Sequence, residues 1–389
     1  MKKVRLGDIA TVITKGTTPT TLGYNFVDDG VNFVKIESIT ENGEFLTDKF
    51  AHITDECDRK LSRSQLQRND LLFSIAGAIG RTAIVTEDIL PANTNQALAI
   101  IRVPEGVADY SYLKYVLQSP DVVEQFEKKK QGVAQLNISL KDIGDFLIPL
   151  RTTEEQKAVV ATMDKVTELI ALRKEQLAKL DQLVKSRFIE LFGDTILNPF
   201  EWEEELLGTV CDVRDGTHDS PQYYEMGYPL VTSKNVTGGK IDLTDCSLIC
   251  EADFKKINER SKVDMGDIIM PMIGTVGNPV IVDIEPNFAI KNVSLIKFRA
   301  DSRVLNTYIH ALLQSDYFDD AVLSKVRGGT QKFISLGDIR KLKVLVPPIE
   351  LQNQFTTFVE QTDKSKLAIQ QSLDKLELLK KSLMQEYFG

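Results

Sequence analysis

The strongest constraint on the fold of this chain is a long internal repeat. The segment QGVAQLNISLKDI at residues 131–143 returns as RGGTQKFISLGDI at residues 327–339, so equivalent positions lie 196 residues apart. Phe192 and Phe388 keep the same spacing. Solenoid repeats have periods of about 20–50 residues, so this period indicates a duplicated domain together with a connecting segment. A chain built in this way is suited to a target with two-fold or bipartite character.

The repeat can be followed through most of both halves. The run DLLFSIAGAIG that begins at Asp70 matches the run DIIMPMIGTVG that begins at Asp267. Further matched positions are Gly16-Thr17 with Gly216-Thr217, Asn95 with Asn292, and Arg102 with Arg299. Residues 18–69 and 218–262 share little. A frame that is kept around divergent loops is expected where the loops recognise different targets.

Composition places the chain among globular proteins. Its 389 residues leave room for two or three domains, and its hydrophobic share of 42% is ordinary. The first ten residues, MKKVRLGDIA, lack the apolar core of a signal peptide, and apolar runs stay short of the ~18–20 residues that span a bilayer. We therefore expect a cytoplasmic protein with no membrane partner.

The four cysteines and three histidines do not predict a metal site. Cys57 and Cys211 stand alone, and the spacing of Cys246 and Cys250 is not completed by a second pair or by neighbouring histidines. The expected metal set is therefore none.

The net charge of −9 is unusual for a protein that binds nucleic acid, which normally shows a basic footprint. Local basic groups do recur at one place in both copies. They are Lys128, Lys129 and Lys130 before the first repeated segment, and Lys325, Arg327 and Lys332 around the second. Such groups either contact phosphates or only solvate a helix end and complement its dipole. The recurrence leaves these two interpretations about evenly matched.

Residue patterns predict an α+β fold for each globular part. Residues 31–39 and 92–103 are apolar runs with β-branched side chains and predict strands, and the run at Asp70 predicts a strand that ends in a glycine turn. Residues 111–129 predict one or two helices with Pro120 as an interruption.

A proline-free and glycine-free stretch follows each globular part, at residues 152–192 and 349–388. Apolar residues in both stretches recur at alternating spacings of four and three, which is typical of a coiled-coil seam. The seam residues are Val159, Met163, Val166, Ile170, Leu177, Leu180, Val184 and Leu191, and Phe355, Val359, Ile369, Leu373, Leu376, Leu383 and Tyr387. Two such helices in one chain are expected to pair with each other, with Lys366 set against Ile170.

These patterns give four segments. We expect one globular domain at residues 1–152, a long helix at 153–193, a second globular domain at 194–348 and a second long helix at 349–389. The sequence has no GxxxxGK[ST] phosphate loop and no dinucleotide fingerprint, and no nucleophile–histidine–acid arrangement stands out. The expected catalytic set is therefore none.

The order and duplication of these motifs resemble the specificity subunit of a type I restriction–modification system. The resemblance rests on the Gly-Thr loops, the runs at Asp70 and Asp267, the two Gly-x-x-Gln-x-x-Ile-Ser-Leu-x-Asp-Ile segments, and the Glu-x-Gln that begins each long helix. It covers nearly the whole chain. The second copy departs slightly, with Leu351 where Glu155 stands and Phe333 where Asn137 stands.

The resemblance implies a fold of two pseudo-symmetric target-recognition domains joined by two long helices in an antiparallel coiled coil. It implies that each domain reads one half of a bipartite, asymmetric DNA site and that the helices fix the gap. Partners would be double-stranded DNA, two modification subunits and restriction subunits. S-adenosylmethionine, Mg and ATP would be cofactors of those partners, with none in this chain.

The resemblance and the position of the divergent loops select the residues expected to contact DNA. They are Lys15, Thr17, Lys35, Arg81, Asn95, Lys129, Lys130, Gln135, Thr217, Lys234, Asn235, Lys291, Asn292, Arg327, Gln331 and Lys332. Base-reading loops are expected at 18–69 and 81–97, and at 218–262 and 278–292. Two alternatives stay open: a two-headed scaffold that binds proteins or glycans, which the acidic charge favours, and a specificity-like subunit of a defence system that only methylates.

Overall fold

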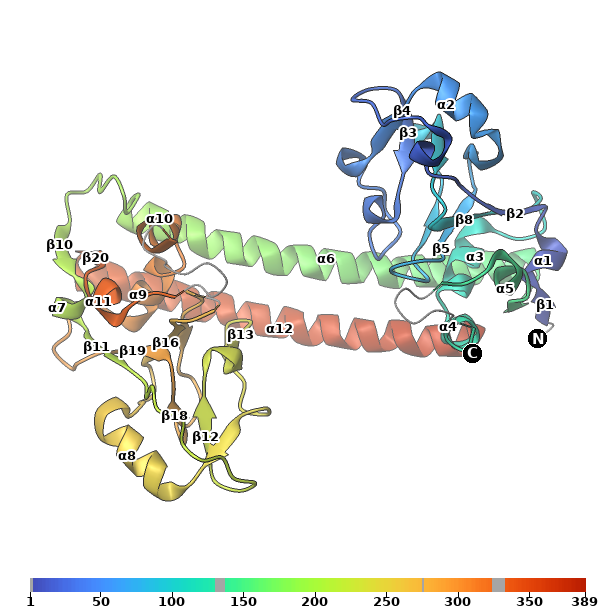
Figure 1. Cartoon of the computed structure of the whole chain (residues 1–389). Helices are drawn as coiled ribbons and strands as arrows, with labels where there is room; N and C mark the ends of the chain where they lie inside the picture. The colour runs from blue at the N-terminus through green and yellow to red at the C-terminus, as the bar shows by residue number, and fades with distance from the viewer. Residues whose placement is uncertain (1–2, 130–136, 275, 324–332) are drawn as a thin grey trace. The chain divides into compact units, whose positions relative to one another are not determined.

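The computed structural model describes residues 3–129, 137–274, 276–323 and 333–389 (Figure 1). The chain divides into two compact units, of which unit 1 comprises Met1–Lys174 with Gln371–Gly389 and unit 2 comprises Glu175–Gln370. Each unit therefore contains one globular part and a portion of both long helices. Sheets and short helices are mixed in both, which confirms the α+β class. Among the described residues, no helix is both long and apolar enough to cross a membrane.

In the residues that the structure describes, unit 1 is built on three small sheets. A four-stranded antiparallel sheet has the order β2-β8-β5-β6, and a three-stranded sheet has the order β4-β3-β7, in which β3 and β7 are parallel. A third sheet pairs β1 with β9, which joins the first strand of the unit to the strand before the long helix. The strands are β1 (Lys3–Arg5), β2 (Val12–Lys15), β3 (Val31–Val34), β4 (Ala51–Ile53), β5 (Leu71–Ser74), β6 (Thr82–Ile84), β7 (Ala92–Thr94), β8 (Leu98–Arg102) and β9 (Leu147–Pro149).

Short helices surround these sheets. The α-helices are α1 (Leu6–Ile9), α2 (Asp55–Lys60), α3 (Tyr110–Leu117), α4 (Pro120–Glu127) and α5 (Leu140–Gly144), and the 3₁₀ turns are η1 (Pro19–Leu22), η2 (Ile36–Ser38), η3 (Thr47–Lys49), η4 (Ser62–Ser64) and η5 (Glu87–Ile89). Pro120 is the first residue of α4, where proline is well tolerated because that N–H has no helical partner. The expected strand at 31–39 is wrong beyond Val34, where η2 replaces it, and the run at 92–103 divides into two strands.

Unit 2 repeats the three sheets, with orders β11-β19-β16-β17, β15-β12-β18 and β10-β20. A further hairpin pairs β13 with β14. The strands are β10 (Glu203–Leu206), β11 (Asp212–Asp215), β12 (Tyr228–Val231), β13 (Val236–Thr237), β14 (Lys240–Ile241), β15 (Ser247–Ile249), β16 (Ile268–Pro271), β17 (Val280–Ile281), β18 (Ala289–Ile290), β19 (Val293–Lys297) and β20 (Lys343–Val346). The short helices are α7 (Leu207–Val210), η6 (Ser233–Asn235), α8 (Glu251–Ser261), α9 (Asn306–Leu312), α10 (Asp316–Leu323) and α11 (Leu336–Arg340).

Strand register corrects one sequence match. Val12 pairs with Arg102 in unit 1, whereas Asp212 pairs with Lys297 in unit 2, so the counterpart of Arg102 is Lys297 and not Arg299. The ion pairs agree. Arg102 donates from Nε and Nη2 to the buried Asp70 at 2.6 and 2.7 Å, and Lys297 Nζ lies 2.5 Å from Asp267 Oδ2. The turn before β19 is shorter than the turn before β8, and matching by residue identity therefore selected Arg299 in place of Lys297.

The repeated Ile-Ser-Leu-x-Asp-Ile motif has a structural explanation. In both copies, the serine hydroxyl caps a short helix by accepting from the aspartate N–H at 3.1 Å, in α5 and α11 respectively. The first isoleucine donates its N–H to the strand end at Ile75 or Met272, and the last isoleucine is fully buried. The residues concerned are Ile138, Ser139, Asp142 and Ile143, and Ile334, Ser335, Asp338 and Ile339. The motif therefore attaches this helix to the main sheet.

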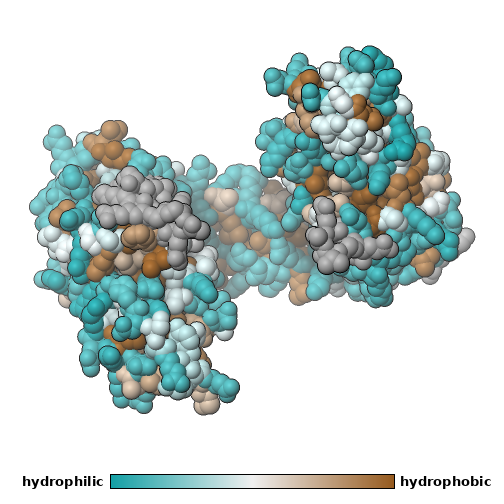
Figure 2. Space-filling model, in the orientation of Figure 1, coloured by the Kyte–Doolittle hydropathy of each residue, from teal (hydrophilic) through white to brown (hydrophobic). Residues whose placement is uncertain are grey.

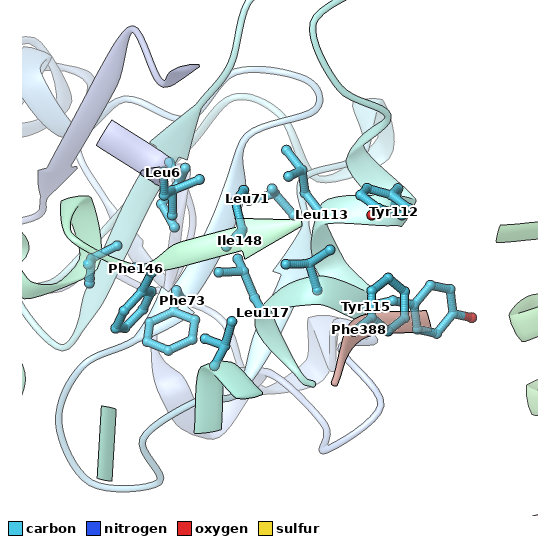
Figure 3. Close-up of a cluster of buried hydrophobic side chains, with 14 of the residues drawn as sticks. Leu6, Leu71, Phe73, Tyr112, Leu113, Tyr115, Leu117, Phe146, Ile148 and Phe388 are labelled. Atoms are coloured by element: carbon cyan, nitrogen blue, oxygen red, sulfur yellow. The ribbon is translucent and has the colours of Figure 1, made fainter. Parts of the chain in front are cut away.

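The core of unit 1 combines both ends of the chain. Figure 3 shows Phe388 at the edge of a cluster that includes Tyr112, Leu71 and Phe73. The rings of Tyr112 and Phe388 lie 5.5 Å apart between centroids. The same cluster takes Val159 and Met163 from the long helix α6 (Thr153–Phe192), and Met384 as well as Phe388 from the long helix α12 (Ile349–Phe388). The start of α6 therefore packs with the end of α12.

Unit 2 shows the converse arrangement. Phe188 and Phe192 from the end of α6 lie against Phe355 from the start of α12 and against Tyr308. The centroids of Phe192 and Tyr308 are 4.8 Å apart. In both units, the two long helices therefore pack in opposite directions.

The long helices bury the predicted seam. All fifteen apolar seam residues are buried or half-buried. Ion pairs flank the seam, with Lys174 Nζ 3.0 Å from Glu377 Oε1 in unit 1 and Lys366 Nζ 2.7 Å from Asp181 Oδ1 in unit 2. Lys366, which the repeat placed against Ile170, thus has a carboxylate of the partner helix as its neighbour.

A buried glutamine ties the start of each long helix to its own globular part. In unit 2, Gln352 is fully buried, accepts from Leu305 N–H at 2.8 Å, and donates to Pro347 O at 2.8 Å and Arg303 O at 3.0 Å. Gln156 does the same in unit 1, with Asp109 N–H at 2.8 Å and Arg151 O at 2.9 Å. The Glu-x-Gln motif is therefore a structural clamp.

We expect Gln352→Ala to lower the free energy of unfolding by about 2–4 kcal/mol, because it leaves buried backbone groups without partners. Urea unfolding of the intact chain measures this change. Gln354→Ala is the matched control, since Gln354 is exposed two residues along the same helix. Equal effects of the two substitutions would contradict the clamp.

Candidate nucleic-acid interface

The repeated Gly-Thr loop of each unit lies directly against the end of a neighbouring strand, which is β7 in unit 1 and β18 in unit 2. A Cβ on Gly16 would lie 1.8 Å from Thr94 O, and one on Gly216 would lie 2.4 Å from Ile290 O, so only glycine fits. Thr217 N–H donates to Ile290 O at 3.0 Å. This close approach places Thr17 beside the turn that contains Asn95, and Thr217 beside Lys291 and Asn292.

An arginine holds the loop in both units, and sequence reasoning missed it. Arg63 donates from Nη2 to Lys15 O at 3.5 Å, and Arg260 donates from Nη2 to the carbonyl oxygens of Asp215 and Gly216 at 3.4 Å each. The two arginines are 197 residues apart, inside segments whose other residues share little. That spacing, close to the period of the repeat, was the only clue in the sequence.

Side chains reach across the loop at one equivalent place in each unit. In unit 1, Thr18 Oγ1 donates to Gln96 Oε1; in unit 2, His218 Nδ1 lies 2.9 Å from Asn292 Oδ1. Gln96 therefore occupies the place of Asn292, and the match of Asn95 with Asn292 is wrong. Asn95 immediately follows β7, as Lys291 follows β18. The Oδ1 atom of Asn95 accepts from Ala97 N–H at 3.0 Å, within its own turn.

Four of the residues expected to contact DNA line one hollow of about 780 Å³ in unit 2. They are Lys234, Asn235, Lys291 and Asn292. Tyr223, Ser233, Asp245 and Ser247 also line it, and they add hydroxyl groups, an aromatic ring and a carboxylate. This set offers donors, acceptors and positive charge from both divergent segments at one opening, which is the chemistry that base edges and phosphates require.

The four residues are not equally available. Lys234 is exposed, and Lys291 Nζ donates to Ser220 Oγ at 2.8 Å. Asn235 is only 6% exposed, and its Oδ1 accepts from the N–H and hydroxyl of Thr232 at 3.0 Å each. Asn235 therefore holds the turn that presents Lys234.

In unit 1, two of the expected contacts, Lys35 and Arg81, lie at η2. Lys35 Nζ lies 4.4 Å from the centroid of the Phe26 ring. Arg81 donates from Nη1 to Ile36 O at 3.2 Å and to Ile39 O at 2.7 Å, so part of its guanidinium holds the turn. Lys15 is exposed at the end of β2.

The basic groups near the repeated segments are described only in part. Lys129 Nζ lies 3.6 Å from Asp142 Oδ1. The Ser139 hydroxyl chiefly, and Lys129 as a lesser cause, hold the pKa of Asp142 below its ordinary value. Lys130, Gln135, Arg327, Gln331 and Lys332 lie outside the described residues.

The surface chemistry agrees with a polar interface. Hydrophilic side chains cover most of the visible face of both units, with small apolar patches among them (Figure 2). Across residues 3–129, 137–274, 276–323 and 333–389, no three His, Cys, Asp or Glu side chains are grouped to hold a metal ion.

Comparison with known proteins gives the family of the chain. The family model described as "Type I restriction modification DNA specificity domain" matches residues 1–182 and 199–379. The EcoBI specificity subunit of Escherichia coli is 30% identical over 172 residues, which covers 43% of this chain and 35% of that subunit. The MjaIX specificity subunit of Methanocaldococcus jannaschii is 23% identical over 393 residues, 92% of this chain and 85% of that protein.

Solved structures show the same fold. The crystal structure of a type I S subunit from M. genitalium covers 100% of this chain and 96% of its own at a TM-score of 0.55 and 15% identity. A structure determined for complex assembly and conformational transition of the type I R-M system covers 99% and 96% at a TM-score of 0.61 and 20% identity. The fold, with two sheet-containing units and two long helices, is therefore shared with these proteins.

Proposed function

The chain belongs to the family of type I restriction–modification DNA specificity domains, and we propose that it is the DNA-recognition subunit of such a system. Each unit reads one half of a bipartite, asymmetric site. The proposal rests on one observation. The two units share the same strands and Gly-Thr loop but present different polar side chains across that loop. Thr18 with Gln96 in unit 1 is replaced by His218 with Asn292 in unit 2. Two different half-sites follow from these different donors and acceptors.

The paired helices supply the fixed gap between the half-sites. Each long helix has 40 residues, about 60 Å at a rise of 1.5 Å per residue. The seam residues and the glutamine clamps make such a pair a stiff spacer. Symmetric readers contact DNA about one helical turn, ~34 Å, apart, and the gap base pairs are then measured and not read.

The chain itself carries out no chemistry in this proposal. Two modification subunits bring S-adenosylmethionine and methylate the DNA, and restriction subunits bring Mg and ATP. The assembly acts in the cytoplasm. Partner subunits also add phosphate contacts, which accounts for a recognition chain with a net charge of −9.

The test is selection from a random-sequence duplex library by the chain in complex with its modification subunit, at low and at moderate salt. We expect bound duplexes to share two short sequences at a constant separation. A complex that binds no duplex more tightly than any other would support the scaffold alternative and overturn the proposal.

Lys234 is expected to contact a phosphate at the rim of the hollow. Lys234→Ala should weaken binding across all selected duplexes and reduce the slope of log affinity against log salt by about one unit. Lys240→Ala is the control, because Lys240 is an exposed lysine on the neighbouring hairpin that does not line the hollow. A changed base preference with an unchanged salt slope would contradict the phosphate contact.

A further inference from the structure

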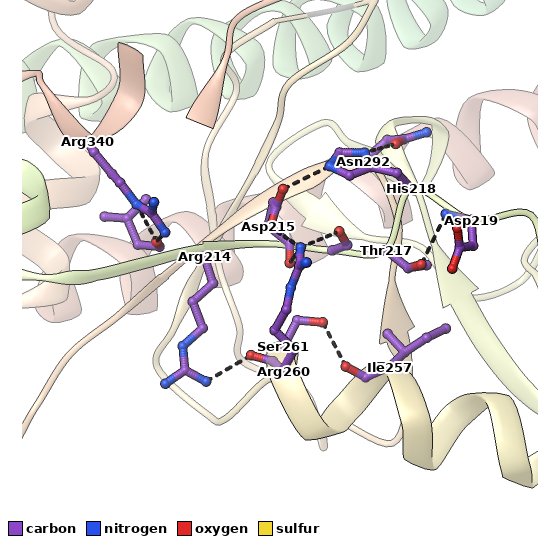
Figure 4. Close-up of polar contacts among 12 residues, drawn as sticks. Arg214, Asp215, Thr217, His218, Asp219, Ile257, Arg260, Ser261, Asn292 and Arg340 are labelled. Carbon is purple, nitrogen blue, oxygen red and sulfur yellow. Dashed lines mark hydrogen bonds and ion pairs between the residues drawn. The ribbon is translucent and has the colours of Figure 1, made fainter. Parts of the chain in front are cut away.

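In unit 2, hydrogen bonds link the side chains of Arg260, Asp215, His218 and Asn292 in series (Figure 4). Asp215, at the end of β11, has a side chain that is 15% exposed, and its Oδ1 accepts from Arg260 Nη2. Its other oxygen, Oδ2, lies 2.8 Å from Nε2 of His218. The second ring nitrogen, Nδ1, lies 2.9 Å from Oδ1 of Asn292. The imidazole therefore joins an anchored carboxylate to an amide that lines the hollow.

The two contacts of His218 fix its protonation state in this arrangement. Both partner atoms are oxygens that accept hydrogen bonds, so both ring nitrogens must donate, and only the imidazolium can do so. A neutral ring has one N–H, which the carboxylate of Asp215 keeps. The lone pair on Nδ1 would then face Oδ1 of Asn292. The amide must turn over, so that Nδ2 donates to Nδ1 and Oδ1 points away.

The surroundings favour the imidazolium. The hydrogen bonds to Asn292 and then to Asp215 raise the pKa of His218 above its ordinary value, against smaller opposing effects of burial and Arg260. The imidazolium therefore predominates at pH values below this raised pKa and is lost as pH rises through it. Further charged groups around the ring and Asn292 are Asp219 in the same loop, Asp253 and Lys256 on α8, and Lys234, Asp245 and Lys291 in the hollow.

We propose that His218 is a positioning residue that sets which edge of the Asn292 amide is offered to DNA. The inference rests on the proposed function and refines it for the second half-site. When His218 holds Oδ1, the amide presents its NH₂ group and selects bases with acceptors in the major groove, such as guanine. When the amide is turned over, Oδ1 faces outward and selects the amino groups of adenine or cytosine.

Unit 1 provides an internal comparison. Thr18 and Gln96 stand where His218 and Asn292 stand in unit 2, and neither titrates near neutral pH. The preference for the first half-site should therefore not respond to the same proton.

The experiment uses the intact chain in complex with its modification subunit and a random-sequence duplex library. Methylated duplexes are sequenced after reaction at pH values from about 5.5 to 9, and base frequencies within each half-site are compared. Base frequencies are compared among duplexes methylated at the same pH, so the pH dependence of the methylation rate, which is common to all of them, cancels. We expect one position of the second half-site to change its preference about tenfold from acceptor-bearing to donor-bearing bases as pH rises.

Two substitutions separate a positioning role from a structural one. His218→Asn places an amide near the position of Nδ1 but does not titrate, so the preference should become independent of pH. Asp215→Asn keeps an acceptor for Arg260 but removes the negative charge beside His218. The change in base preference at the second half-site should therefore occur at lower pH. An unchanged first half-site in both variants reports an intact fold.

A second half-site whose preference is constant across pH in the unsubstituted complex would overturn the inference and leave the proposed function standing. So would a His218→Asn variant that keeps the same transition. Methylated duplexes without two half-sites would overturn the proposed function and the inference together.

Discussion

A fragment that comprises residues 1–193 should form a symmetric dimer and, with its modification subunit, methylate an inverted repeat of the first half-site. The fragment contains one globular part and α6. What it lacks is the end of α12, from which Met384 and Phe388 enter the core of unit 1. A second copy supplies replacements, because Phe188 and Phe192 stand at the equivalent positions 196 residues earlier. A two-fold axis would then replace the internal repeat.

The fragment dimer should be weaker than the intact pairing for a specific reason. Arg187 takes the place of Leu383, which packs against the core of unit 1. In the intact chain, Arg187 instead pairs with Glu190 at 2.8 Å and lies over Phe358 at 5.9 Å from its centroid. A charged side chain in place of a half-buried leucine costs about 1 kcal/mol at each of two sites.

Arg187→Leu should therefore tighten the fragment dimer about 30-fold, measured as the dissociation constant by analytical ultracentrifugation. Lys185→Leu is the matched control, because Lys185 is exposed on the same helix. A strict monomer, or a dimer that still methylates the asymmetric site of the intact chain, would contradict the duplicated arrangement.

Replacing residues 1–150 by the equivalent part of a related subunit should change the first half-site completely and leave the second half-site and the gap unchanged. The boundary at 150 precedes α6, so the seam of the helix pair is kept. The recognition loops of unit 1 lie wholly within the exchanged part, whereas His218, Arg260 and Asn292 do not. Methylation mapping of the chimera reads all three quantities in one experiment.

Two controls make the exchange decisive. The exchanged segment must supply a backbone N–H that donates to Gln156 Oε1, as Asp109 does at 2.8 Å, so a relative with such a donor is chosen. Thermal unfolding then reports whether the chimera is folded. A change in both half-sites, or in the gap, would show that the two units do not read DNA independently.

The larger features of the fold were accessible from the sequence because they rest on strong, long-range patterns. The repeat of 196 residues predicts two similar units, and the four–three spacing of apolar residues predicts two long helices. These helices are Thr153–Phe192 and Ile349–Phe388 in the structure. Such patterns extend over tens of residues, so a local exception such as Lys366 does not hide them.

The recognition loops could not be aligned from the sequence because short insertions and deletions shift the residue matches locally, between segments that still align. Three residues separate β7 from β8, whereas two separate β18 from β19. Asn95 and Asn292 were matched as identical residues, but Gln96 makes the contact that corresponds to that of Asn292. Side-chain contacts across the loop decide the equivalence, and residue identity does not.

Recurrence alone also did not distinguish function from architecture. Ser139 and Gln156 recur because they cap a helix and satisfy buried backbone groups. The residues that differ between copies, such as Thr18 and His218, are the ones that give each opening its chemistry. In a duplicated recognition protein, we expect the motifs shared by both copies to stabilise the common fold and the residues that differ to determine what each copy recognises.

The most direct test of this account is methylation mapping of a random-sequence library in cells that carry the chain with its modification subunit. The account predicts a methylated site of two unrelated short sequences, separated by a gap of constant length and indifferent composition. A single continuous sequence, or two sequences at variable separation, would contradict it.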